Sequence, residues 1–182
     1  MRATLARPIH RGGFPQLQRR LCEDAGALGT LRQRPQSRRS QQCLSRDRPP
    51  ATPVFHAFSY ARPGKSLAPN FVIAGSGEVS ERGGNYRDHI VAYGDTSSAG
   101  MREKANCVLD EMERRLGALG FGWKDTTDTQ VYTVFDVHSY LADDLVRRGA
   151  ASRGFTWHFC RPPIIGLEFE MDCRGVETEY VL

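Results

Sequence analysis

A run of apolar residues at steps of three and four along the chain is the feature that most constrains its fold. The run begins at Met101 and ends at Leu119, and residues at these spacings share one face of an α-helix. Oxygen-bearing side chains at residues 95–98 can cap the start of this helix, and Gly120 marks its end. An amphipathic helix of this length needs an apolar surface to cover, which favours a domain with helices packed on a sheet. The apolar positions are Met101, Ala105, Val108, Leu109, Met112, Leu116 and Leu119.

Short β-prone segments precede and follow this helix, and a second helix is expected from about Ser139 to Gly149. The order β-β-α-β-α-β-β predicts an α+β sandwich with helices on one face of a mixed sheet, although the last two strands can also form one bent hairpin. The other sheet face, expected to be apolar, then needs cover from another subunit, so an oligomer is expected. The predicted strands are residues 71–75, 89–93 (the weaker signal), 130–135, 156–160 and 167–172.

The first 53 residues differ in composition from the rest of the chain. They contain 11 Arg, no Lys and three acidic residues, a net charge of +8, whereas residues 54–182 carry −4. So polar a segment buries too little apolar area to offset the entropy lost on ordering it. We therefore expect residues 1–53 to be a disordered, dispensable extension and residues 54–182 to be the folded domain. The extension has three possible explanations: an organellar presequence, a basic binding arm, or a start codon placed too early. The early start codon is favoured.

Charge and cysteine content exclude several function classes. The chain has a net charge of +4, but the excess lies in the extension, so the acidic domain argues against nucleic-acid binding. Five scattered cysteines without a Cys-x-x-Cys pair fit neither a disulfide framework nor a zinc site, and they indicate reduced thiols in a cytoplasmic setting. No apolar stretch approaches the ~20 residues of a membrane span, so no membrane partner is expected.

Several segments, in order, resemble the YjgF/RidA family of small imine deaminases, and the resemblance covers about residues 66–182. It implies a chorismate-mutase-like β-β-α-β-α-β sandwich that assembles as a trimer with clefts between its subunits. It also implies hydrolysis of reactive 2-imino acids to 2-keto acids and ammonia. The matching segments are NFVIAG (residues 70–75), the long helix and the turn after it (101–123), TQVYT (129–133), CRPP (160–163) and LEFEM (167–171).

The arginine that binds the substrate carboxylate in that family has two candidates here. Arg161 lies seven residues before Glu168, closer than the family's usual spacing. When the proline turn after Arg161 is aligned instead, Arg153 is the nearer match for carboxylate binding. The family's Ser-Gly-Gln segment begins here with Ala74, which lacks the hydroxyl, so we expect a substrate other than the common 2-imino acids of that family.

Hydrolysing an imine requires an anchor for the substrate carboxylate, an oriented water and a group that handles protons. The planar fork of a guanidinium binds a carboxylate through two hydrogen bonds, so Arg161 is predicted to bind substrate. Glu168 and Glu170 alternate with apolar residues and therefore share one strand face. By the resemblance, Glu168 is the expected catalytic residue that orients the water. The structural alternative is an ion pair between Arg161 and Glu168 or Glu170 across a hairpin.

Three further residues are candidates for the same site. Cys160 adjoins Arg161, which can lower the pKa of the thiol, although a strand cysteine is more often a small core residue. His158 shares the strand face of Cys160 and is a candidate proton shuttle, although a lone histidine is usually neither a shuttle nor an interface donor. By the resemblance, Tyr60 is a candidate for closing the cleft over the substrate.

No metal and no cofactor are expected. The aspartates at 125, 128, 143 and 144 lack the loop spacing of a calcium site, and residues 80–85 lack the lysine and the strand-to-helix context of a phosphate loop. The sequence therefore predicts a homotrimeric deaminase that acts on small carboxylate-bearing imines or enamines in clefts between subunits. The alternative is a non-catalytic family member that binds a metabolite or a protein partner in the same cleft.

Overall fold

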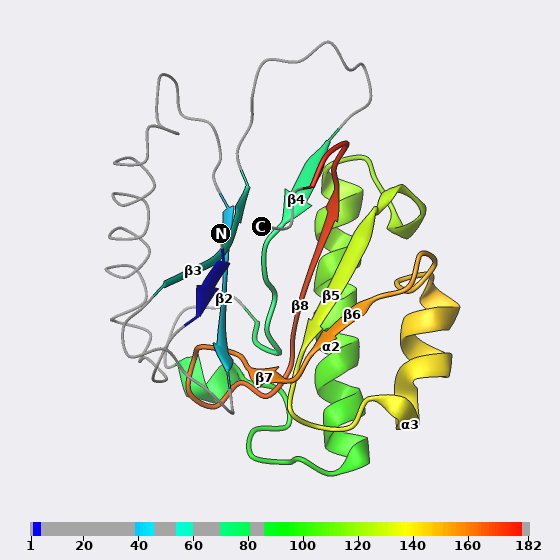
Figure 1. Ribbon diagram of the computed structural model, residues 1–182. Coiled ribbons are helices and arrows are strands. Elements are labelled where there is room, and N and C mark those ends of the chain that lie inside the picture. Colours follow the sequence, from blue (N-terminus) through cyan, green and yellow to red (C-terminus); the bar gives the residue numbers. More distant parts are fainter. Residues whose placement is uncertain (1, 5–38, 46–53, 60–69, 81–85, 180–182) are drawn as a thin grey trace.

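Two four-stranded sheets and one long helix dominate the fold seen in a computed structural model (Figure 1), which describes residues 2–4, 39–45, 54–59, 70–80 and 86–179. The first sheet has the order β4-β8-β5-β6, with β8 antiparallel to β4 and β5, and β6 parallel to β5. The second has the order β1-β3-β2-β7. The strands are β1 (Arg2–Thr4), β2 (Arg39–Ser45), β3 (Val54–Ser59), β4 (Phe71–Ile73), β5 (Asp128–Tyr132), β6 (Thr156–His158), β7 (Cys160–Arg161) and β8 (Glu170–Gly175).

The long helix α2 (Ser98–Ala118) confirms the helix predicted from the apolar spacing. Ser97 caps it by accepting a hydrogen bond from the Gly100 N–H at 3.2 Å, and Gly120 ends it with a φ of 79°. Its apolar face packs on the β4-β8-β5-β6 sheet (Figure 1), and the core between them includes Val108, Met112, Val131, Met171 and Cys173.

Shorter helical segments complete the described part of the chain. The second predicted helix is present as α3 (His138–Tyr140) continued by the π-helix η5 (Leu141–Val146), and the other two are the 3-10 turns η3 (Tyr86–His89) and η4 (Trp123–Asp125). Among the described residues, no helix combines the length and the apolar character that crossing a membrane requires.

Several strand predictions are wrong in detail. The predicted strand 130–135 is β5, which ends at Tyr132, and the predicted strand 156–160 is divided between β6 and β7. Residues 89–93 form no strand, because the chain turns at 91–94 and leaves only an isolated bridge between Val79 and Ile90. The last strand begins at Glu170 rather than at residue 167. The two final strands also form no hairpin, since β6 pairs with β5 while β8 lies between β4 and β5.

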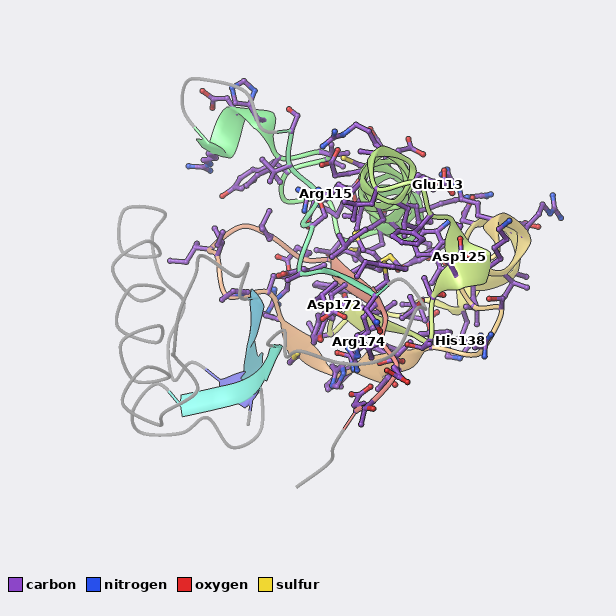
Figure 2. All side chains as sticks on the ribbon, turned by 90° about the horizontal axis from the view of Figure 1, so that it is seen from above. Glu113, Arg115, Asp125, His138, Asp172 and Arg174 are labelled. Atoms are coloured by element: carbon purple, nitrogen blue, oxygen red, sulfur yellow. The ribbon has the colours of Figure 1, made fainter. Side chains whose placement is uncertain are left out.

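The sheet face away from α2 is polar, which corrects the expectation of an apolar face. Tyr132 Oη donates to Gln130 Oε1 at 2.5 Å and to Asp172 Oδ2 at 2.8 Å, and all three side chains are buried. Arg174 pairs with Asp128 at 2.5 Å on the same face. Figure 2 shows Asp172 and Arg174 on the opposite side of the sheet from α2. Because these polar groups satisfy one another, an exposed apolar face no longer argues for the trimer, which stays a prediction.

Strands β1 and β2 lie within residues 1–53, where composition predicts no regular structure. Both pair with β3, and β2 also pairs antiparallel with β7, with Leu44 opposite Arg161 and Ser45 opposite Cys160. At these ten residues the structure differs from the expectation, because strand pairing uses main-chain groups that composition does not reveal. The other residues of 1–53 lie outside the described part, and the domain boundary at residue 53 stays a prediction.

This pairing predicts that removing residues 1–53 destabilises the protein, against the expectation of dispensability. The deletion removes β2 and leaves the backbone of Cys160 and Arg161 without its strand partner. We expect the free energy of unfolding to fall by more than about 1 kcal/mol, the order of one or two lost hydrogen bonds. Denaturant unfolding measures the change, and a variant lacking only residues 1–38 is the control because it keeps β2. Equal unfolding midpoints for the full chain and the variant lacking residues 1–53 would contradict this prediction.

Candidate functional site

The candidate site forms where the first sheet meets the second. A single residue separates β6 from β7, so the chain passes from one sheet into the other between His158 and Cys160. The segment that leads into β8 lies beside the end of β5, where Thr133 Oγ1 donates to the main-chain oxygen of Glu168 at 2.8 Å. These connections bring the two strongest sequence candidates, Arg161 and Glu168, to the same place.

Arg161 and Glu168 form an ion pair in which Arg161 Nη1 donates to Glu168 Oε2. The guanidinium also lies over the ring of Phe135, with Arg161 Cζ 5.3 Å from the ring centroid. The Arg161 side chain is 47% exposed and that of Glu168 16%, so solvent reaches both side chains. The pairing left open as the structural alternative is therefore present, and the guanidinium still presents N–H groups to a carboxylate from solution.

The backbone of Glu168 is held by a second carboxylate, that of Glu78. Glu78 Oε1 accepts a hydrogen bond from the Glu168 N–H at 2.5 Å, and Oε2 accepts one from the Phe169 N–H at 3.0 Å. These bonds explain why β8 begins late: the N–H groups of residues 168 and 169 point to Glu78 rather than to a neighbouring strand.

Glu78 has a buried cationic partner, Lys104 of α2. The Lys104 Nζ lies 3.6 Å from Glu78 Oε1, and neither side chain has any exposed surface. Nζ also donates to the main-chain oxygen of Val91 at 3.0 Å. Burial raises the pKa of the Glu78 carboxyl, and the N–H donors and the Lys104 charge act in the opposite direction.

Sequence reasoning missed both Glu78 and Lys104. For Lys104 a signal was present, because it lies three residues after Met101 and four before Val108, on the apolar face of the helix. A charged residue at such a position is buried with a partner or is costly. Glu78 carried no comparable signal, since its hydrogen-bond partners lie about ninety positions further along the chain.

Three of the other predicted site residues lie on or beside β6 and β7. Cys160 is 4% exposed and packs with Tyr132, and His158 stacks on the same ring with 4.7 Å between the ring centroids. Arg153 is exposed and precedes β6, whereas Arg161 follows it, so the two arginines lie at opposite ends of this strand. Tyr60 lies outside the described residues.

The aspartates considered as metal ligands form ion pairs with arginines or accept a hydrogen bond from the backbone of a helical turn. Asp144 binds Arg102, Asp143 binds Arg147 and Asp128 binds Arg174, while Asp125 accepts from the Gly122 N–H. In the described part of the chain, no three histidine, cysteine, aspartate or glutamate side chains gather as a metal site would require.

Comparison with known proteins adds a family and a curated relative. A family model described as 2-aminomuconate deaminase CnbZ matches residues 4–180. The chain is 47% identical over 146 residues to a 2-amino-5-chloromuconate deaminase of Comamonas testosteroni. The alignment covers 79% of this chain but only 58% of that relative, so the chain spans little more than half of its length.

Solved structures give weaker likenesses. A Rid family protein of unknown function from Yersinia pestis is 17% identical, with a TM-score of 0.43 over 66% of this chain and 84% of the other. A YjgF/YER057c/UK114 family member from Mycobacterium tuberculosis is 16% identical, with a TM-score of 0.39 over 60% and 80%. TM-scores this low leave the fold to be described from the chain's own sheets and helices.

Proposed function

The chain belongs to the 2-aminomuconate deaminase CnbZ family, and on that premise we propose that it removes the amino group of a 2-aminomuconate-type substrate by hydrolysis. This family membership confirms the resemblance to a Rid-type deaminase family that the sequence motifs indicated. Within the structure, the observation that carries the proposal is the solvent-accessible Arg161–Glu168 pair, which combines a carboxylate anchor with a carboxylate that can orient water.

The chemistry of such a substrate explains what the site has to do. A 2-aminomuconate is a six-carbon dicarboxylate in which the amino group is attached to a C=C bond, so it is an enamine. Moving a proton to carbon gives the imine, whose C2 is electrophilic. Water adds to C2, the C–N bond breaks and ammonia leaves, so that one substrate and one water give one keto acid and one ammonia. No oxidation or reduction occurs.

Arg161 is the proposed anchor for the substrate carboxylate next to C2. The ion pair with Glu168 uses Nη1, and the half-exposed guanidinium has further N–H groups with which to form a forked contact. Glu168 is the proposed catalytic residue. Its Oε2 bonds Arg161, which leaves Oε1 to accept a hydrogen bond from the water that attacks C2.

The exposure of the Arg161 side chain is also relevant to which parts of the assembly enclose the substrate. The Arg161 side chain is 47% exposed, so this chain alone would leave one side of a carboxylate bound there in contact with solvent. We propose, as the sequence resemblance implies, that a neighbouring subunit of a trimer supplies the second wall and that the substrate binds between subunits.

One observation favours a second candidate, carboxylate binding without turnover. The guanidinium of Arg161 is already neutralised by Glu168, which is also the arrangement of a structural ion pair. The two functions differ in one respect: a binding protein is stabilised by its ligand but releases no ammonia.

The experiment that tests the proposal follows ammonia release from 2-aminomuconate together with the loss of its conjugated absorbance. We expect one ammonia per substrate consumed, and a higher kcat/KM than for monocarboxylate imines generated by an amino-acid oxidase. Ammonia at the rate seen without enzyme would contradict the proposed function. In that case, a rise in melting temperature with muconate, which lacks the amino group, identifies the binding protein.

A further inference from the structure

We propose that the buried Glu78–Lys104 pair is a positioning device that holds Glu168 in the orientation needed for catalysis. This inference rests on the proposed function, because it concerns how the catalytic carboxylate is aimed. Glu78 acts through the backbone of Glu168 and touches no substrate, so it is a positioning residue rather than a catalytic one.

The segment that carries Glu168 lacks the support of a sheet. Strand β8 begins at Glu170, so the N–H groups of residues 168 and 169 precede its pairing with β5. Glu78 replaces that support, because each of its carboxylate oxygens accepts a hydrogen bond from one of these two N–H groups. Because these two hydrogen bonds come from consecutive N–H groups, they fix both the position and the orientation of the backbone at Glu168.

A third contact completes the constraint on Glu168. Thr133 Oγ1 donates to the main-chain oxygen of Glu168 at 2.8 Å, so both main-chain polar groups of this residue are bound by side chains. With its backbone held on both sides, the Glu168 side chain is directed toward Arg161, with which it pairs. The Phe169 side chain is fully buried in the core, which anchors the neighbouring residue as well.

Lys104 explains how a fully buried carboxylate can serve this purpose. A carboxylate without exposed surface is costly unless it is paired and hydrogen-bonded, and the ammonium 3.6 Å away supplies the charge. Apolar side chains of similar volume often pack as well as a buried ion pair. They cannot accept N–H bonds, however, so core packing alone does not account for a carboxylate at residue 78.

The test separates positioning from simple stabilisation with two variants and a control. Glu78→Gln keeps the shape, but it has one acceptor oxygen in place of two and leaves the Lys104 charge buried without a carboxylate. The double variant Glu78→Gln/Lys104→Met removes that buried charge as well. Asp144→Asn is the matched control, since Asp144 is a largely buried carboxylate paired with Arg102 of α2 and lies outside the site.

We expect Glu78→Gln to lower kcat by about 10-fold or more at a nearly unchanged KM, because small misplacements of a catalytic group are costly while Arg161 is untouched. In the double variant, the melting temperature should recover toward that of the unaltered protein while kcat stays low. Asp144→Asn should lower the melting temperature with kcat unchanged. Recovery of kcat together with stability in the double variant would overturn the proposal and leave a structural role.

Nuclear magnetic resonance supplies a readout that needs no activity. The amide protons of Glu168 and Phe169 donate to a carboxylate, so their signals should move on Glu78→Gln, and should not move on Asp144→Asn. Unmoved signals would show that Glu78 does not hold this backbone, whatever the activity. If the signals move but the unaltered protein releases no ammonia, the proposed function fails while the hold on the Glu168 backbone is established.

Discussion

Replacing Glu168 with glutamine is expected to lower kcat for ammonia release by ~10²-fold or more, with little change in KM. The amide keeps the size of the side chain and can still accept a bond from Arg161, but it has no charge with which to orient and polarise the attacking water. Steady-state kinetics with 2-aminomuconate measure the effect. The melting temperature of the variant shows whether the loss comes from the site or from unfolding.

The matched control for this change is Glu113→Gln. Glu113 is a half-exposed carboxylate of α2 that accepts a hydrogen bond from Trp123 Nε1 at 3.0 Å and has no part in the site. Its variant should keep the kcat of the unaltered protein. If Glu168→Gln retains more than about a tenth of kcat, the size of a marginal acid–base contribution, another group orients the water.

Replacing Arg161 with lysine is expected to raise KM by about 10-fold or more, while kcat falls less. An ammonium is a point charge and cannot reproduce the fork that binds two carboxylate oxygens, so the loss appears in binding. The substitution also removes the guanidinium that lies over the Phe135 ring. Initial rates over a range of 2-aminomuconate concentrations separate the two parameters.

Arg153→Lys is both the control and the rival for this prediction. Arg153 lies before β6, at the other end of this strand from Arg161, so its variant should leave KM unchanged. A raised KM in Arg153→Lys, with Arg161→Lys unaffected, would move the carboxylate anchor to Arg153. If neither variant binds more weakly while ammonia release persists, no arginine of this pair anchors the substrate.

The parts of the fold that the sequence predicted are those with local signals. Helix α2 has an apolar face, a capping serine at Ser97 and a stop at Gly120, all within about two dozen residues, and each is present in the structure. Strand β4 was predictable in the same way from its apolar run. The meeting of Arg161 and Glu168 was predictable as an alternative, because they lie seven residues apart in one connection.

The parts that could not be predicted depend on contacts between distant segments. The start of β8 is set by Glu78, ninety residues before Glu168, which binds N–H groups that a periodic pattern assigns to a strand. The alternation of residues 167–172 already places polar side chains on one sheet face, but the bond from Tyr132 to Asp172 depends on the pairing of β5 with β8, which neither strand shows by itself. The pairing of β2 with β7 is likewise a main-chain contact between segments with no shared side-chain pattern.

The most direct measurement is a crystal structure of the protein with muconate, which retains the unsaturated dicarboxylate skeleton and lacks the reactive amino group. We expect one carboxylate in a forked contact with Arg161, and a water on Glu168 about 3–3.5 Å from the adjacent carbon, the distance from which attack proceeds. Muconate bound elsewhere, for example at Arg153, with the Arg161–Glu168 pair unchanged, would contradict the assignment of this pair as the reacting centre.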